Sequence, residues 1–208
     1  MAKRKRSQRS ARKPRKSLLE RRQEGAKKGL VRKAQKLARA DKWPLRECLI
    51  NASWREAQMA VIVVSRNRPD GSIAGAMCLV DMGCMGVKEA QVGLGMGWGV
   101  YSKMRRVVED LKHGETIDCP PELALKIILT AKAYGEELGF VQAEETPLVL
   151  ALLKNVDASS CSEDVEVGKD GMPNYIRSSG DADEAVLAHL QERVGPEGFM
   201  MTVEELPG

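Results

Sequence analysis

The side chains with the clearest chemistry in this sequence are the basic ones of its first 43 residues, which suit the binding of phosphate groups. Of the 33 Lys and Arg residues in the chain, 18 fall in this segment, against three of the 29 acidic residues. The segment carries a net charge of +15, and the rest of the chain carries −11. Each basic side chain placed on a phosphate releases a condensed counterion, so such a block attracts polyanions. Residues 1–43 are therefore predicted to be a nucleic-acid-binding arm.

The arm divides into two parts of different composition. Residues 3–16 contain Pro14 and no large apolar side chain, so we expect them to lack structure until a partner binds. Residues 18–24 and 30–40 are rich in helix formers, whereas Gly25 and Gly29 predict an interruption between two short helices. In the second helix, the spacing of Lys28, Arg32, Lys36 and Arg39 places these four side chains on one face.

The predicted nucleic-acid contacts are basic side chains of the arm and three on a helix expected over residues 101–113. They are Lys3, Arg4, Lys5, Arg6, Arg9, Arg12, Lys13, Arg15, Lys16, Arg21, Arg22, Lys27, Lys28, Arg32, Lys33, Lys36, Arg39, Lys103, Arg105 and Arg106. Such contacts hold the phosphate backbone without reading sequence. Trp43 is the only aromatic residue of the arm, so the arm offers little stacking on unpaired bases.

RNA is favoured over DNA as the partner. Short basic arms that order on binding suit irregular folded RNA, and the sequence has no helix-turn-helix or zinc-finger pattern. The composition of residues 3–16 is similar to the tails of ribosomal proteins. We therefore expect a non-enzymatic RNA-binding protein, associated with the ribosome or its assembly, with ribosomal RNA as the favoured target. The alternative within the binding class is a DNA-associated protein that uses the arm non-specifically. A basic tail that only aids solubility is the alternative without a binding function.

A membrane partner is not expected. The chain has no run of about 18 uninterrupted apolar residues, and the arm lacks the apolar face of a membrane-surface helix. No apolar stretch of a secretory signal follows the first charges, so a cytoplasmic location is expected. A mitochondrial transit peptide is also basic but is less favoured, because residues 1–16 have no apolar face. The sequence leaves the oligomeric state open.

The five cysteines indicate reduced thiols rather than a metal site or a disulfide framework. Their number is odd, no two have C-x-x-C spacing, and the chain has only two histidines. We expect Cys48, Cys78, Cys84, Cys119 and Cys161 to be mostly small core residues. No metal and no cofactor are predicted.

A catalytic alternative rests on Asp81, Cys84 and Lys88. A carboxylate at a strand end, near a thiol and an amine, could serve a hydrolase or nuclease with Asp81 near its centre. However, no histidine lies near Cys84 in sequence and no second carboxylate clusters with Asp81. We expect Asp81 to form turn hydrogen bonds, and we predict no catalytic residue.

The glycine run Gly93, Gly95, Gly97, Gly99 resembles a phosphate-binding loop only superficially. It lacks the spacing of a P-loop and that of a dinucleotide-binding fingerprint. We expect a flexible loop that packs its glycines and Trp98 against the core.

The element pattern indicates an α+β fold with two β-hairpins flanking a group of helices. Pro44 is taken to end the arm, and residues 44–208 to form a single domain. Strands are expected over 58–66 and 72–80, joined by a turn with Asp70-Gly71, and both are apolar enough to be covered on both faces. The expected helices cover 101–113, 122–138, 147–154 and 183–194, the third of these being short and apolar. A second hairpin is expected from 165–168 and 173–177 around Lys169-Asp170-Gly171.

Most of residues 47–199 resembles an uncharacterised bacterial protein family. The resemblance rests on Trp54, Arg66, Leu79-Val80-Asp81-x-x-Cys84-x-Gly86-Val87-Lys88, Glu137-Leu138-Gly139-Phe140 and Gly168-Lys169-Asp170-Gly171. It implies one intact domain and no activity, because none is established for that family. Related sequences typically carry Pro-His directly after Gly-Phe, whereas this chain has Val141-Gln142. Any chemistry of that histidine is therefore expected to be lost here.

Overall fold

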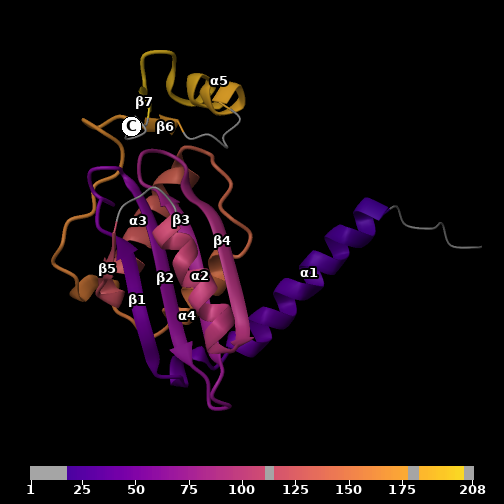
Figure 1. The fold of residues 1–208 in the computed structure, drawn as a ribbon. Coiled ribbons are helices and arrows are strands. Elements are labelled where there is room, and N and C mark those ends of the chain that lie inside the picture. Colours follow the sequence, from indigo (N-terminus) through magenta and orange to yellow (C-terminus); the bar gives the residue numbers. More distant parts are fainter. Residues whose placement is uncertain (1–17, 111–114, 178–182, 204–208) are drawn as a thin grey trace, which may run out of the picture.

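The core of the molecule is a five-stranded antiparallel sheet in the order β4-β3-β2-β1-β5. The computed structural model describes residues 18–110, 115–177 and 183–203 (Figure 1). The strands are β1 (Leu45–Asn51), β2 (Met59–Asn67), β3 (Ile73–Asp81), β4 (Gly86–Met96) and β5 (Thr116–Asp118). The first four follow one another as a meander, and β5 pairs with β1. The predicted α+β class is confirmed.

The β2–β3 hairpin confirms the strongest local prediction from the sequence. Its register runs from Asn67 opposite Ile73 to Met59 opposite Asp81. Gly71 in the connecting turn has φ +77°, a left-handed conformation that glycine adopts without strain. Every residue of β2 from Met59 to Arg66 is buried, as expected for a strand covered on both sides.

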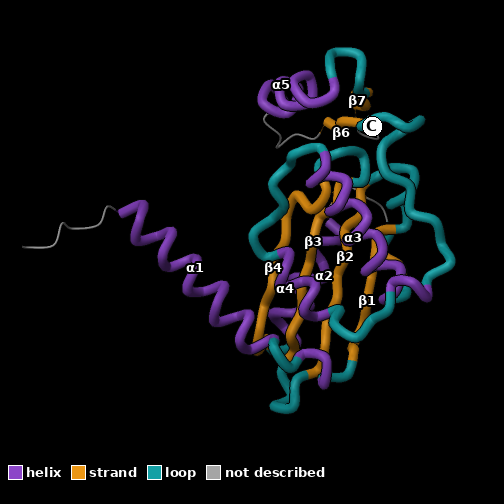
Figure 2. Tube along the Cα trace, turned by 180° about the vertical axis from the view of Figure 1, so that it is seen from behind, coloured by secondary structure: helices purple, strands orange, loops and turns teal. Residues whose placement is uncertain are grey.

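Helices cover both faces of this sheet. On one face α3 (Pro121–Glu137) and α4 (Thr146–Leu152) pack against alternate side chains of β2 such as Ile62. On the other face α2 (Trp98–Asp110) places Tyr101 against Val61 and the neighbouring apolar side chains. Figure 1 shows α2 in front of the sheet, and Figure 2 shows α3 and α4 from the opposite side.

The glycine run is not a flexible loop as predicted, because Gly93 and Gly95 lie in the edge strand β4 and Gly99 lies in the first turn of α2. β4 pairs along β3, with Gly93 opposite Gly75. A Cβ at Gly93 would lie 2.4 Å from the sulfur of Met96, and one at Gly75 would lie 3.0 Å from the Tyr101 ring. These glycines therefore make room for side chains that pack on the sheet. Trp98 does not pack into the core as predicted, because 54% of its surface is exposed.

The arm enters the domain as one helix, so the predicted break at Gly25 and Gly29 is wrong. α1 runs without interruption over Leu18–Leu37 and is followed by a 3₁₀ turn at Ala40–Lys42. A glycine in an exposed helix costs only about 1 kcal/mol, and packing at the C-terminal end of α1 opposes that cost. Leu37, Ala40 and Trp43 are buried in the main core, which therefore extends to the N-terminal side of the predicted division at residue 43.

The C-terminal segment forms a second, smaller unit at one end of the sheet (Figure 1). β6 (Asn174–Arg177) pairs in parallel with β7 (Met200–Val203), and α5 (Asp183–Val194) packs beside them. The predicted second hairpin is therefore wrong. Lys169 and Met172 do form a tight turn, but residues 165–167 make no strand, because the partner of β6 comes from the end of the chain. The prediction of helix 183–194 is confirmed.

None of the helices in the described part of the chain is long and apolar enough to cross a membrane.

Candidate nucleic-acid interface

The basic residues of α1 lie on a helix that extends away from the domain (Figures 1 and 2). Lys27, Lys28, Arg32 and Lys36 are exposed, and so is Arg39, which follows the end of the helix. Residues 25–40 include no Asp or Glu. Glu24 lies one turn before Lys28 and Asp41 follows the segment, so the five cations outnumber the acidic residues beside them. A surface with such an excess of positive charge attracts a polyanion.

The opposite side of α1 holds the helix on the domain. Leu30 is partly buried against the main core, and Leu37 is part of it. Between them Lys33 donates a hydrogen bond from Nζ to Oε1 of Glu145 at 2.5 Å, next to α4. Glu145 is also bound by the backbone N–H of Val92 in β4, at 2.6 Å from Oε2. Lys33 is thus already engaged with a carboxylate, unlike the cations that face solvent.

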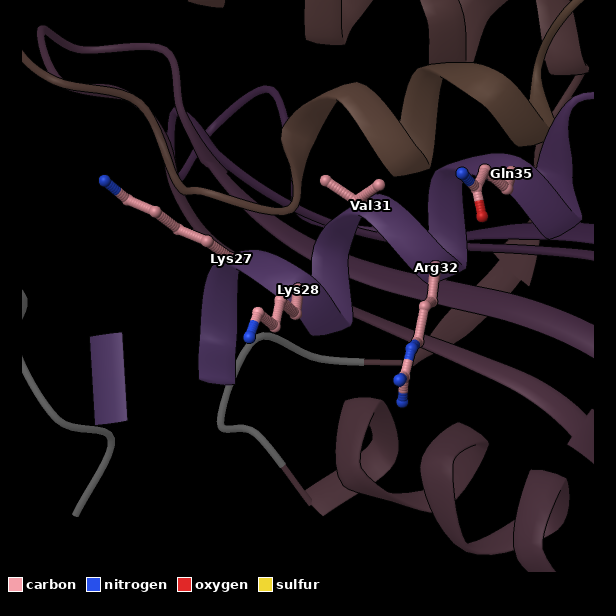
Figure 3. A pocket seen from close by; sticks show the side chains of 5 residues that line it. All are labelled: Lys27, Lys28, Val31, Arg32 and Gln35. Carbon is pink, nitrogen blue, oxygen red and sulfur yellow. The ribbon is translucent and has the colours of Figure 1, made fainter. Parts of the chain in front are cut away.

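A shallow hollow of about 380 Å³ lies along α1 and is lined by Lys27, Lys28, Val31, Arg32 and Gln35 (Figure 3). All five residues belong to a single helix, so the hollow is a stretch of helix surface rather than an enclosed pocket for a small molecule. Lys28 and Arg32 point to one side of the helix in this view, and Val31 points to the other. The feature therefore lacks the enclosure of a small-molecule site.

The predicted cations of α2 lie on the other face of the sheet. Lys103 and Arg106 are exposed, and Arg105 is half-buried. Burial raises the pKa of the Tyr101 phenol above its ordinary value, and the nearby positive charge of Arg105 opposes that change. The structure therefore does not join these cations with Lys28 and Arg32 into one face.

The structure reverses the expected burial of two tryptophans, Trp43 and Trp98. Trp43 is buried, with the guanidinium of Arg68 5.5 Å from its ring centroid, so it offers no surface for stacking. Trp98, expected in the core, is the exposed tryptophan at the start of α2. Its hydrophobicity alone predicted burial, and no local signal in the sequence identified it as an exposed residue.

Part of the predicted set lies outside the described residues. Side chains are described only from Glu24 onward in the arm. The predicted contacts that this excludes are Lys3, Arg4, Lys5, Arg6, Arg9, Arg12, Lys13, Arg15, Lys16, Arg21 and Arg22.

Asp81 forms the turn hydrogen bonds expected of it. Its Oδ1 accepts the backbone N–H groups of Cys84 at 2.9 Å and Met85 at 3.4 Å. The carboxylate is fully buried, and its Oδ2 has no hydrogen-bond partner within the described ranges. Burial raises the pKa of Asp81, although the backbone N–H bonds and Lys88 oppose that change.

The surroundings of Asp81 are also closed. Cys84 is fully buried beneath Leu138 and Tyr175, under the C-terminal unit. Gln142, the second residue after Phe140, accepts the Val87 N–H at 2.6 Å and donates to the Met85 carbonyl at 3.2 Å. The amide therefore has a structural role at the position where the family resemblance predicts a histidine.

The described residues contain no group of three or more His, Cys, Asp or Glu side chains that could hold a metal ion. All five cysteines are free thiols, and four of them are buried. Burial raises the pKa of the Cys78 thiol to about 12, which disfavours the reactive thiolate. Cys48 and Cys119 lie opposite one another where β1 meets β5, and the backbone N–H of Cys119 donates to the Cys48 carbonyl at 2.9 Å.

Comparison with known proteins found no matching family model, no matching curated protein and no matching solved structure. The family resemblance noted in the sequence therefore stays an expectation.

Proposed function

We propose that this protein is a non-enzymatic RNA-binding protein that holds phosphate groups along the exposed basic side of α1. The observation that carries the proposal is the division of α1 into two sides. Leu30, Lys33 and Leu37 hold the helix on the domain, while Lys28, Arg32 and Lys36 face solvent. A basic helix fixed at one end and exposed along its length can lie against phosphates while the domain stays folded.

RNA suits this surface for physical reasons. The major groove of an A-form helix is too deep and narrow for side chains to read, so proteins contact its phosphates and irregular regions instead. Lys27, Lys28, Arg32, Lys36 and Arg39 can supply five phosphate contacts. With about 0.7–0.9 per contact, log K should fall by about 3.5–4.5 per tenfold rise in salt from these residues alone.

The test compares two variants that each lose three positive charges. Lys28→Gln/Arg32→Gln/Lys36→Gln removes three charges from α1. Lys132→Gln/Lys169→Gln/Arg193→Gln removes three charges from α3, the turn before β6, and α5. Binding to a structured ribosomal RNA fragment is measured from 50 to 300 mM salt. The α1 variant should bind more weakly, and its fall in log K per tenfold rise in salt should be smaller by about 2–3. The control variant should match the wild type. Equal behaviour of the two variants would reject the proposed surface.

A DNA duplex of the same length in the same assay separates the two nucleic-acid proposals. Tighter binding to the duplex than to the RNA would favour the DNA-associated alternative.

We further propose that the target is ribosomal RNA, on the basis of the arm's composition. Sedimentation of a native lysate through a gradient tests this. The protein should travel with ribosomal particles at low salt and leave them at high salt, because phosphate contacts weaken with salt. Protein that stays at the top of the gradient in both conditions would overturn ribosome association while leaving RNA binding to be judged by the first assay.

No observation favours the alternative of a hydrolase or nuclease centred on Asp81. Asp81 is fully buried and both of the N–H groups that it accepts belong to its own turn.

A further inference from the structure

We propose that Trp98 is a stacking platform for an unpaired RNA base, at the end of the sheet where α1 meets the domain. The inference rests on the proposed function and adds to it a second contact of a different kind. Trp98 begins α2 directly after β4, and 54% of its surface is exposed. Indole rings stack on any base through its π-face, without regard to sequence.

One side of the Trp98 ring is already occupied by a cation. The guanidinium carbon of Arg46 lies 5.0 Å from the Trp98 ring centroid and 6.0 Å from that of Tyr101. The Arg46 guanidinium is held there by a 3.1 Å hydrogen bond from Nη1 to Oδ1 of Asn67. Arg46 therefore steadies the ring and places a positive charge beside any base stacked on its exposed surface.

The Trp98 ring also packs against the buried ring of Tyr101. Tyr101, one turn later in α2, is fully buried and lies 6.0 Å from Trp98 between ring centroids, at an interplanar angle of 49°. The Tyr101 hydroxyl donates to Oε1 of Glu47 at 2.5 Å, which ties α2 to β1. Stacking costs less entropy on a ring whose position is fixed in this way.

Positive side chains continue from the ring in both directions. Along α2, Arg106 lies eight residues after Trp98, about 12 Å along the helix axis and about 80° around it. In the other direction, Lys42 and Arg39 precede Arg46 in the sequence and follow α1. α1 meets the domain at the end of the sheet where β1 begins (Figure 1). A run of positive side chains beside an exposed ring suits an anionic strand with bases that can stack, which is the combination found in single-stranded nucleic-acid sites.

The test measures binding of the full-length protein to two RNA probes of equal length, an unstructured oligo(U) and a perfect duplex. Trp98→Ala should weaken oligo(U) binding about fivefold to a hundredfold, from the usual contribution of one stacked base. Duplex binding should not change, because its bases are already stacked. Trp98→Phe should restore most of the oligo(U) affinity, and Val100→Ala, which truncates another exposed apolar residue of α2, should leave both affinities unchanged.

The outcomes separate the two proposals. Equal oligo(U) binding by the wild type and Trp98→Ala would overturn the stacking platform and leave the proposed function standing. Failure of the wild type to bind either probe would overturn both. A Trp98→Ala variant that changes sedimentation of the free protein but not RNA affinity would show that this surface mediates self-association instead.

Discussion

Lys33 of α1 and Glu145, the residue before α4, form a 2.5 Å ion pair that fixes the basic helix to the domain. The Glu145 carboxylate also accepts the Val92 N–H, so one side chain connects α1, α4 and β4. The pair distinguishes a cation with a structural role from its exposed neighbours on the same helix.

We expect Lys33→Gln to loosen α1 without unfolding the domain. The pair is partly exposed, at 34% for Lys33 and 21% for Glu145, so its loss should cost no more than about 1 kcal/mol of global stability. Amide hydrogen exchange over residues 24–36 should become faster, because the anchoring contact is removed. Lys36→Gln, which removes the same charge from the exposed side, is the matched control. Equal exchange rates in the two variants would contradict the anchoring role.

Arg66 has a structural role of a similar kind at the centre of the fold. It is buried, and its guanidinium donates to the carbonyl oxygens of Leu152 at 2.5 Å, Trp43 at 2.6 Å and Lys154 at 3.2 Å. These bonds join β2 to the end of α4 and to the segment after α1. Burial lowers the pKa of Arg66, and the charge of Asp41 opposes that change.

We expect Arg66→Lys to destabilise the protein by about 2–5 kcal/mol, because a lysine ammonium cannot reproduce the planar fork and leaves buried carbonyls unsatisfied, each at about 1–3 kcal/mol. Urea unfolding measures the change. Arg32→Lys, at an exposed position of α1, should stay within about 0.5 kcal/mol of the wild type. Similar losses in both variants would show that the three carbonyl contacts contribute little.

Local signals in the sequence were sufficient for some elements of this fold. The β2–β3 hairpin was predictable because Asp70-Gly71 lies between two apolar runs, and α5 because its helix pattern ends at Gly195-Pro196. β4 was not, since its Gly93 makes room for the Met96 side chain, a contact that only the folded sheet reveals. The partner of β6 was missed for the same reason: β7 is distant in sequence.

The sequence predicted which residues of the candidate interface are cations, but it did not predict which of them are exposed. The sequence identifies Lys28, Lys33 and Arg32 equally as cations, but only tertiary packing engages Lys33 with Glu145. Hydrophobicity likewise cannot tell Trp43 from Trp98, because burial depends on which surface each ring meets after folding.

Asp81 gives the protein a pH dependence whose sign follows from its burial. Burial raises the pKa of Asp81 above the usual value near 4. The folded state then binds the proton more tightly than the unfolded state does. This contribution to stability is fully present below the ordinary pKa and is lost as the pH rises toward the raised value.

Asp81→Asn cannot ionise, yet its amide oxygen can still accept the Cys84 and Met85 N–H groups. We therefore expect the free energy of unfolding of the wild type to fall relative to Asp81→Asn as the pH rises from about 4 to 7. Asp81→Ala removes the acceptor at every pH and should cost about 1–3 kcal/mol for each N–H left unsatisfied. Urea unfolding of the three proteins at several pH values measures this. Parallel profiles for the wild type and Asp81→Asn would show that Asp81 does not titrate in this range.

The same variants also test the hydrolase alternative. Loss of an RNA-cleaving activity in Asp81→Ala alone would reflect the damaged turn, whereas loss in a fully folded Asp81→Asn would point to chemistry at the carboxylate.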